Sequence, residues 1–346
     1  MDCDAVGAAY RSPETCSPFI SISGLRVPLP MHSALDHVSV DYTLGAKQRA
    51  ADYPTLDAKL ERAAEVSRTA LEQYDRPAVM WTGGKDSTLV LYVVREVAAD
   101  LGLDVPPVVY IEHFEGLDDV RAFVDRWVDA WDLDLVVARN EDFFDRGWAF
   151  GDEVPVADLS EDTRRELARI DYDAETLVVD PDSFEGNHLL KTVALNDAIV
   201  EYGFDGVFSG VRWDEQASRA EETFFSPRHD AAKYPPHDRV NPILQFTEAD
   251  LWDAFWNFVV PDSVEGYPAG HVPQSRGDLP DGVALADVPV PEKYFEGFRS
   301  LGTETGSEKS DDRPAWIQDL ENTTERAGRA QDKENLMERL RDLGYM

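Results

Sequence analysis

The stretch "PAVMWTGGKDSTLVLYVV", from Pro77 to Val94, places a polar turn between two apolar runs. The first run predicts a short strand and the second predicts a helix. In the turn, Gly83 and Gly84 allow backbone N–H groups to approach an anion without interference from a Cβ atom, and Lys85 can neutralise its charge. The turn therefore predicts a phosphate site. An ordinary strand-to-helix connection is the alternative.

The rest of the turn favours a bound nucleotide. Ser87 and Thr88 open the helix, where free N–H groups and the helix dipole favour an anion. Asp86 is unsuited to phosphate alone, but its carboxylate suits Mg²⁺ on a nucleotide. A Walker P-loop requires Ser or Thr directly after the lysine, whereas Asp86 follows Lys85 here. The sequence thus predicts a phosphate loop of a different type.

Strand-like and helix-like segments alternate around this turn. We expect strands at 78–81, 106–113, 133–140 and 204–212, and helices at 55–74, 87–102, 117–132 and 186–203. This alternation predicts an α/β fold, a parallel twisted sheet with helices on both faces. Ligands of such sheets lie beyond the carboxyl ends of the strands, where the turn, "EHFEG" and "SGVRWDE" all fall.

The flanking regions are less regular. We expect an N-terminal extension over 1–52, a nucleotide-binding domain over 53–260 and an irregular, loop-rich C-terminal extension over 261–346 that ends in a helix. Met31 is an alternative start to Met1. A helix should begin after Thr247, because Asp250 follows three residues later as in a capping box.

A second cluster of charged residues follows the strand at 204–212. Guanidinium groups suit phosphate and sulfate oxygens, so Arg212 and Arg219 are candidates for an anion site. Gly210, Asp214 and Glu215 lie in the same segment, "SGVRWDEQASRAEE". The alternative is a surface salt-bridge cluster. Lys191, on an otherwise apolar helix face, either extends to solvent or points at the nucleotide.

Composition narrows the classes of function. The chain of 346 residues has 68 acidic and 33 basic residues, a formal net charge of −35, and only eight lysines. Such a surface is typical of a protein dissolved in concentrated salt, which screens the self-repulsion, and we expect a salt-loving archaeal source. The acidity argues against a broad nucleic-acid surface. Cys3 and Cys16 are the only cysteines, so we expect no iron–sulfur cluster and no Cys-ligated zinc.

Targeting signals are not evident. No apolar run approaches the 18 residues that would indicate a membrane span, and the first residues lack the basic and apolar regions of a signal peptide. We therefore expect a cytoplasmic protein. The histidines lack metal-binding spacing such as H-E-x-x-H.

Several motifs carry a resemblance to a known family. The stretch "VMWTGGKDSTLVLYVV" resembles the PP-loop, S-G-G-x-D-S, of N-type ATP pyrophosphatases, with Thr82 in place of the first Ser. Three other segments are similar to the branch that contains phosphoadenylylsulfate reductase and the small, catalytic subunit of sulfate adenylyltransferase: "LLKTVALNDAIVEYGFDGVFSGVRWDEQASRAEE", "VNPILQFTEADLWDAFW" and "FRSLGTETG". The ending, "TTERAGRAQDKENLMERLRDLGYM", is similar too, and the resemblance covers roughly residues 53–346.

This resemblance implies a fold and a reaction. The fold is the Rossmann-like one of adenine nucleotide alpha hydrolases. The reaction is ATP cleavage between the α- and β-phosphates, with sulfate as acceptor and pyrophosphate released. The implied pyrophosphate ligands are Thr82, Gly83, Gly84, Lys85, Ser87 and Thr88 with Gly210, and Asp86 holds Mg²⁺. Lys191, Arg212 and Arg219 balance the developing charge, and Asp214 and Glu215 orient the arginines or the metal. Because forming adenylyl sulfate is uphill, a GTPase large subunit is the implied partner.

Some positions depart from the family pattern. Trp213 stands where the family has a second arginine, and Thr303 stands where Cys is usual. The reductase chemistry needs a C-terminal Cys, and none follows Cys16. Two alternatives therefore remain open: a related enzyme that acts on another acceptor or in sulfur transfer, and a non-catalytic subunit that binds adenine nucleotides.

Overall fold

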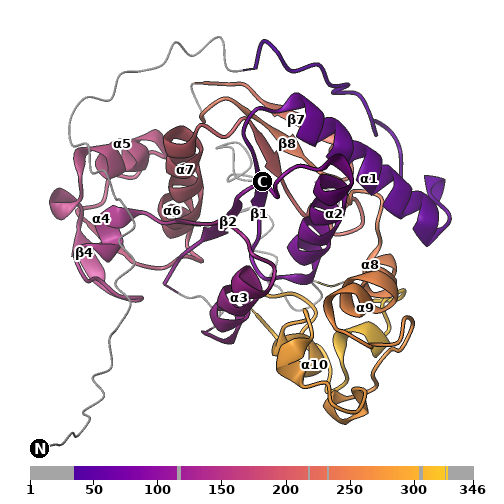
Figure 1. Cartoon of the computed structure of the whole chain (residues 1–346). Coiled ribbons are helices and arrows are strands. Elements are labelled where there is room, and N and C mark those ends of the chain that lie inside the picture. The colour runs from indigo at the N-terminus through magenta and orange to yellow at the C-terminus, as the bar shows by residue number, and fades with distance from the viewer. Residues whose placement is uncertain are drawn as a thin grey trace, which may run out of the picture. The chain divides into compact units, whose positions relative to one another are not determined.

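The computed structural model describes residues 35–114, 118–216, 219–231, 234–303, 307–323 and 325 (Figure 1). Residues 32–346 belong to one compact unit. Cys3, Cys16, the alternative start at Met31 and the predicted C-terminal helix lie outside the described residues. The predicted domain boundaries at 53 and 261 stay a prediction.

The described residues contain a six-stranded sheet with the order β3-β2-β1-β6-β8-β7. Its strands are β1 (Pro77–Met80), β2 (Val108–Ile111), β3 (Leu135–Ala138), β6 (Gly206–Phe208), β7 (Phe225–Arg228) and β8 (His237–Val240). All neighbours pair in parallel except β7, which runs antiparallel to β8. In register, Val79 of β1 lies beside Val108 and Phe208. The predicted parallel α/β fold is confirmed.

Helices cover both faces of this sheet (Figure 1). Their bounds are α1 (Leu56–Gln73), α2 (Lys85–Leu101), α3 (Asp118–Ala130) and α7 (Ala194–Tyr202). Apolar residues of α1, α2 and α3 join the main core, which includes Val79 and Val108. Leu195 and Ile199 of α7 pack instead against Ala78 and Val109, which point to the opposite face. Alternating side-chain directions along each strand explain this division.

The segment after β8 contributes further helices to the main core. These are α8 (Glu248–Ala254), the π-helical turn η5 (Phe255–Val259), α9 (Val260–Ser263) and, beyond a long irregular stretch, α10 (Glu292–Phe295). The Thr247 side chain accepts a hydrogen bond from the backbone N–H of Asp250, and the Asp250 carboxylate accepts one from that of Thr247. The predicted capping box of this helix is confirmed. Trp252, Phe255 and Trp256 are buried there.

The acid-rich insertion between β3 and β6 builds a core of its own. It contains α4 (Glu141–Phe144), β4 (Glu153–Pro155), α5 (Glu161–Arg169) and β5 (Thr176–Val178), followed by α6 (Phe184–Asn187) and the π-helical turn η3 (His188–Val193). Strands β4 and β5 pair antiparallel. Leu159, Leu167 and Leu177 pack against Leu189 and Leu190 of η3. The insertion is therefore anchored to the helix that carries Lys191.

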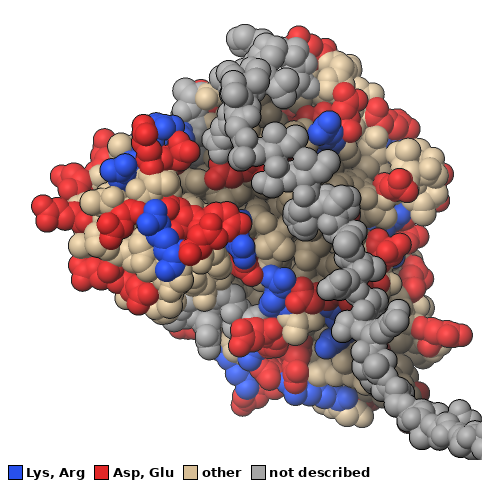
Figure 2. All heavy atoms as spheres, turned by 60° about the vertical axis from the view of Figure 1, so that its left-hand side comes forward, with Lys and Arg blue, Asp and Glu red and all other residues tan. Residues whose placement is uncertain are grey.

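The surface is predominantly acidic on the face drawn in Figure 2, where Lys and Arg side chains are scattered among Asp and Glu. Many basic groups of the described residues are held in ion pairs, such as that of Arg121 with Glu112 and Asp125. The described residues drawn in Figure 2 form no broad basic patch. In the described residues, the helices are too short or too polar to cross a membrane.

Candidate nucleotide-binding site

The polar turn lies at the carboxyl end of β1, the central strand, as predicted. Gly83 has a φ of +75°, and a Cβ atom there would lie 2.9 Å from Cγ1 of Val120 on α3. The fold itself thus requires Gly83. Gly84 is different, because it has an ordinary extended backbone with φ at −73°, and a Cβ atom there would meet nothing closer than Oγ1 of Thr82, at 3.3 Å. Close approach by a ligand is a reason for glycine at this position.

The contrast between the two glycines gives a direct test. Gly84→Ala should change the free energy of unfolding by less than about 1 kcal/mol, since its backbone is ordinary. If the turn is the predicted phosphate site, the change should weaken ATP binding at least tenfold, because the methyl group would stand in the path of a phosphate to the helix N-terminus. Gly83→Ala should instead lower the melting temperature. Calorimetric titration with ATP and thermal unfolding measure both effects. A Gly84→Ala protein that binds ATP like the wild type would exclude the turn as the phosphate site.

Lys85 begins α2 and is buried. Its Nζ donates to the carbonyl oxygen of Arg299 at 2.9 Å, lies 3.2 Å from a carboxylate oxygen of Asp86 and forms an ion pair with Glu325. Burial alone would lower the pKa of Lys85, but the charges of Asp86 and Glu325 outweigh it and raise that pKa. The side chain therefore keeps its positive charge. Its backbone N–H donates to the hydroxyl of Tyr294 at 2.9 Å.

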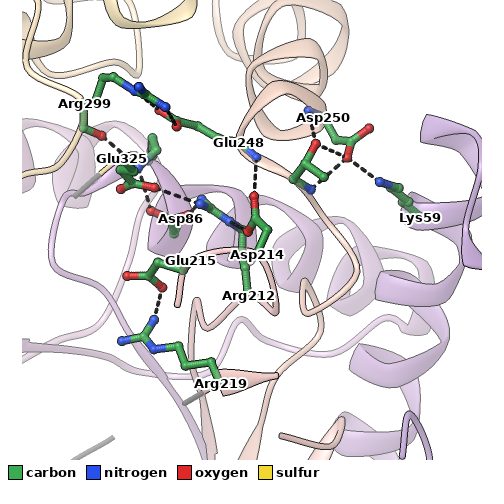
Figure 3. Close-up of polar contacts among 12 residues, drawn as sticks. Lys59, Asp86, Arg212, Asp214, Glu215, Arg219, Glu248, Asp250, Arg299 and Glu325 are labelled. Atoms are coloured by element: carbon green, nitrogen blue, oxygen red, sulfur yellow. Dashed lines mark hydrogen bonds and ion pairs between the residues drawn. The ribbon is translucent and has the colours of Figure 1, made fainter. Parts of the chain in front are cut away.

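Arg212 follows β6 and meets the same carboxylates. It forms ion pairs with Asp86, with Asp214 (Nε to Oδ1, 2.9 Å) and with Glu325 (2.8 Å) (Figure 3). Its side chain is 1% exposed. Burial alone would lower the pKa of Arg212, but the charges of the three carboxylates outweigh burial and raise that pKa well above its usual value. The two cations thus face one another across Asp86 and Glu325.

Gly210 explains how β6 comes so close to α2. A Cβ atom on Gly210 would lie 3.0 Å from the backbone carbon of Asp86 and equally close to the amide nitrogen of Ser87. These are backbone contacts that cannot rotate away. Gly210 therefore lets the loop that carries Arg212 pack directly on the first turn of α2.

The C-terminal part of the chain supplies site residues that the sequence analysis missed. Arg299 pairs with Glu248 of α8 (Nε to Oε1, 3.2 Å) and donates from NH1 to Thr323 at 2.6 Å. The backbone N–H of Glu248 donates to Asp214 at 3.0 Å. Together with Glu325 and the Tyr294 hydroxyl, these groups complete what we call the ion-pair network. Its members are Lys85, Asp86, Arg212, Asp214, Glu248, Arg299 and Glu325.

Four other predicted residues lie near the turn or the network and make contacts within the protein. Thr88 is buried, and its hydroxyl accepts a hydrogen bond from Nε1 of Trp81 at 3.0 Å. Ser87, also buried in the first turn of α2, bonds back to the glycine turn: its hydroxyl accepts a hydrogen bond from the backbone N–H of Thr82 and donates to the carbonyl of Gly84. Arg219 and Glu215 form an ion pair with each other beside the network (Figure 3).

Lys191 lies in the π-helical turn η3, which directly precedes α7. Burial, together with the charge of Lys191, lowers the pKa of the nearby His113 to about 4. His113 follows β2 in the "IEHFEG" segment. The structure thus brings Lys85, Asp86, Arg212 and Asp214 into one network, and Lys191 acts on His113 through its charge.

The family of the chain follows from comparison with known sequences. The profile of the phosphoadenosine phosphosulfate reductase domain family matches residues 76–261, more than half of the chain. The chain therefore belongs to this family, which confirms the predicted membership.

Two curated relatives within this similarity are sulfate adenylyltransferase subunits. The sulfate adenylyltransferase subunit 2 of Psychromonas ingrahamii is 25% identical over 335 residues, which cover 86% of this chain and 99% of that protein. A sulfate adenylyltransferase subunit 2 from Chromohalobacter salexigens is 26% identical and covers 81% of this chain and 93% of its own length. These names denote a nucleotidyltransferase, in agreement with the predicted enzyme class. Among solved structures, phosphoadenylyl-sulfate reductase from Candida auris aligns with a TM-score of 0.45 at 13% identity, over 73% of this chain and 96% of that one.

Proposed function

We propose that the chain is a sulfate adenylyltransferase catalytic subunit. An oxygen of sulfate attacks the α-phosphorus of ATP, the bond between the α-phosphorus and the bridging oxygen to the β-phosphorus breaks, and pyrophosphate leaves with that oxygen. The observation that carries the proposal is the buried pair Lys85 and Arg212, which lies at the glycine turn and at the N-terminus of α2. Phosphoryl chemistry of this kind depends mainly on positioning and charge neutralisation.

Each part of the site has a role in this proposal. The turn from Thr82 to Gly84 and the hydroxyl of Ser87 bind the pyrophosphate, and Lys85 and Arg212 neutralise it. Lys191 and Arg219 supply positive charge for the sulfate acceptor. Mg²⁺ is usually held by one or two carboxylates and the substrate phosphates, and the ion-pair network at the turn offers four carboxylates. Asp86, whose side chain is 25% exposed, is the residue that fits.

The same proposal includes a partner subunit and the salt conditions in which the protein works. Formation of adenylyl sulfate is uphill, so a GTPase large subunit supplies the driving force. The names of the relatives, which specify a subunit 2, support an assembly of this type. The net charge of −35 supports function at high salt, in the cytoplasm of a salt-loving archaeon.

The reverse reaction offers the sharper assay because it runs downhill. With adenylyl sulfate, pyrophosphate and Mg²⁺ in concentrated salt, we expect the purified chain to form ATP. Asp86→Asn should lower the rate at least 100-fold, since it removes the proposed metal ligand but keeps the shape of the side chain. Glu321→Gln, a change in an exposed acidic residue, should leave the rate unchanged. A folded wild-type protein that forms no ATP would exclude this activity.

A non-catalytic nucleotide-binding subunit is the second candidate. Trp213 favours it, because the indole is buried against Phe224 and donates to the carbonyl of Glu222 at 2.9 Å. An arginine cannot keep these contacts, so the residue beside Arg212 contributes packing and no charge. ATP binding without any acceptor-dependent release of pyrophosphate would identify this function.

A further inference from the structure

The Glu325 carboxylate occupies the space between the two buried cations. One oxygen pairs with Nζ of Lys85. The other lies 2.8 Å from Nη2 of Arg212 (Figure 3). The side chain is 6% exposed. Burial alone would raise the pKa of Glu325, but the charges of Lys85 and Arg212 outweigh it and hold that pKa far below its usual value. The group is therefore an anion at neutral pH, placed as an oxygen pair between two cations.

The charge of the surrounding network bears on what can bind there. The network contains three cationic and four carboxylate side chains, so its formal charge is −1 with every member ionised. A polyphosphate adds several more negative charges. It can enter only if positive charge accompanies it or if one carboxylate leaves, because unpaired like charges in a buried site are costly.

Glu325 is the carboxylate that can leave with the smallest loss of structure. Asp214 also accepts the backbone N–H of Glu248, and Glu248 holds the guanidinium of Arg299. The Asp86 carboxylate also pairs with Lys85 and Arg212, but its backbone is fixed in the first turn of α2 beside both of them. In the part of the chain that the structure describes, Glu325 contacts only the two cations through its side chain.

We propose that Glu325 is a built-in competitor of the substrate, an intramolecular anion that holds the pyrophosphate position between Lys85 and Arg212 until the nucleotide displaces it. The proposal rests on the assignment of this site to ATP. The carboxylate keeps both cations in place and charged in the empty enzyme. It also lowers the affinity for free polyphosphates, since each must first displace it.

Inorganic pyrophosphate is the probe, because it tests the anion site without the adenine. In calorimetric titrations of the full-length chain at high salt, we expect Glu325→Gln to bind pyrophosphate at least tenfold more tightly than the wild type. The amide keeps the shape of the side chain and removes its charge. Glu325→Asp keeps the charge, but its shorter side chain cannot reach both cations, so its affinity should lie between the two. Glu321→Gln, an exposed change four residues earlier, should bind like the wild type.

The outcomes separate this proposal from the proposed function. Equal or weaker pyrophosphate binding by Glu325→Gln would overturn the competitor role, even if the wild type converts adenylyl sulfate to ATP. Tighter binding would support it, even if no acceptor reaction is found. Thermal unfolding checks that each variant is folded. If Glu325→Gln does not fold, Glu325→Asp decides in the same way, since tighter binding supports the role and equal or weaker binding overturns it.

Discussion

Arg212→Ala should produce a protein that is about 3–5 kcal/mol less stable and that no longer binds ATP. The guanidinium is buried and faces three carboxylates, those of Asp86, Asp214 and Glu325. Removing one partner of a buried ionic network leaves uncompensated charge, and losses of about this size are typical. Chemical unfolding measures the stability, and calorimetric titration measures the affinity for ATP.

Two further variants show whether the effect comes from the buried position and the geometry of Arg212. Arg212→Lys keeps the charge but loses the planar fork that contacts several carboxylates, so stability and affinity should fall only in part. Arg313→Ala removes an exposed arginine that pairs with Asp311, and its melting temperature should match that of the wild type. If Arg212→Ala were as stable as Arg313→Ala, the ion-pair network would not hold the fold together.

Acidification from pH 6.5 to pH 4.5 should cost the wild type about 2–3 kcal/mol of unfolding free energy through His237 alone. Burial lowers the pKa of His237 to about 3, with help from the charges of Arg239 and Arg228, although the hydrogen bond to the Pro235 carbonyl opposes the shift. The unfolded chain therefore takes up a proton near pH 6.5, and the folded chain does so only near pH 3. Each pH unit in between costs about 1.4 kcal/mol.

His237→Asn isolates this contribution. An amide can still donate to the Pro235 carbonyl, which the ring Nδ1 does at 2.8 Å, but it does not titrate. Unfolding curves at several pH values should show that the difference between wild type and variant shrinks as the pH falls from 6.5 to 4.5. His271→Gln, in a loop, is the control for removing a histidine elsewhere. Parallel pH profiles of the wild type and His237→Asn would contradict the assignment.

The central part of the fold is predictable because its residues follow simple periodicities. Strands β2 and β6 are almost wholly buried, and β1, β3 and the helices between the strands bury their apolar residues in part or on one face, as their apolar patterns indicate. Strand β8 could not be recognised in this way, because "HDRV" is fully buried but mostly polar. Its Asp238 is satisfied by the hydroxyls of Tyr42 and Tyr74, each at 2.8 Å. Such distant partners are not visible in a local pattern.

The same limit applies to the candidate site. Lys85, Asp86, Arg212 and Asp214 were found because each lies next to a strand end with a recognisable pattern. Arg299 and Glu325 lie in "FRSLG" and "TTERAG", segments that carried the family resemblance without a chemical role of their own. Only the three-dimensional packing brings their charges to the turn.

The hydrogen bond from Lys85 to the Tyr294 hydroxyl spans 209 positions of the sequence, and the ion pair from Lys85 to Glu325 spans 240. During synthesis on the ribosome, the glycine turn therefore leaves the exit tunnel long before the groups that cover it exist. The nascent domain can form its sheet while both cations still lack their last counter-ion. Assembly of the site therefore follows synthesis of the sheet strands, and a later part of the chain must pack back against the central strand.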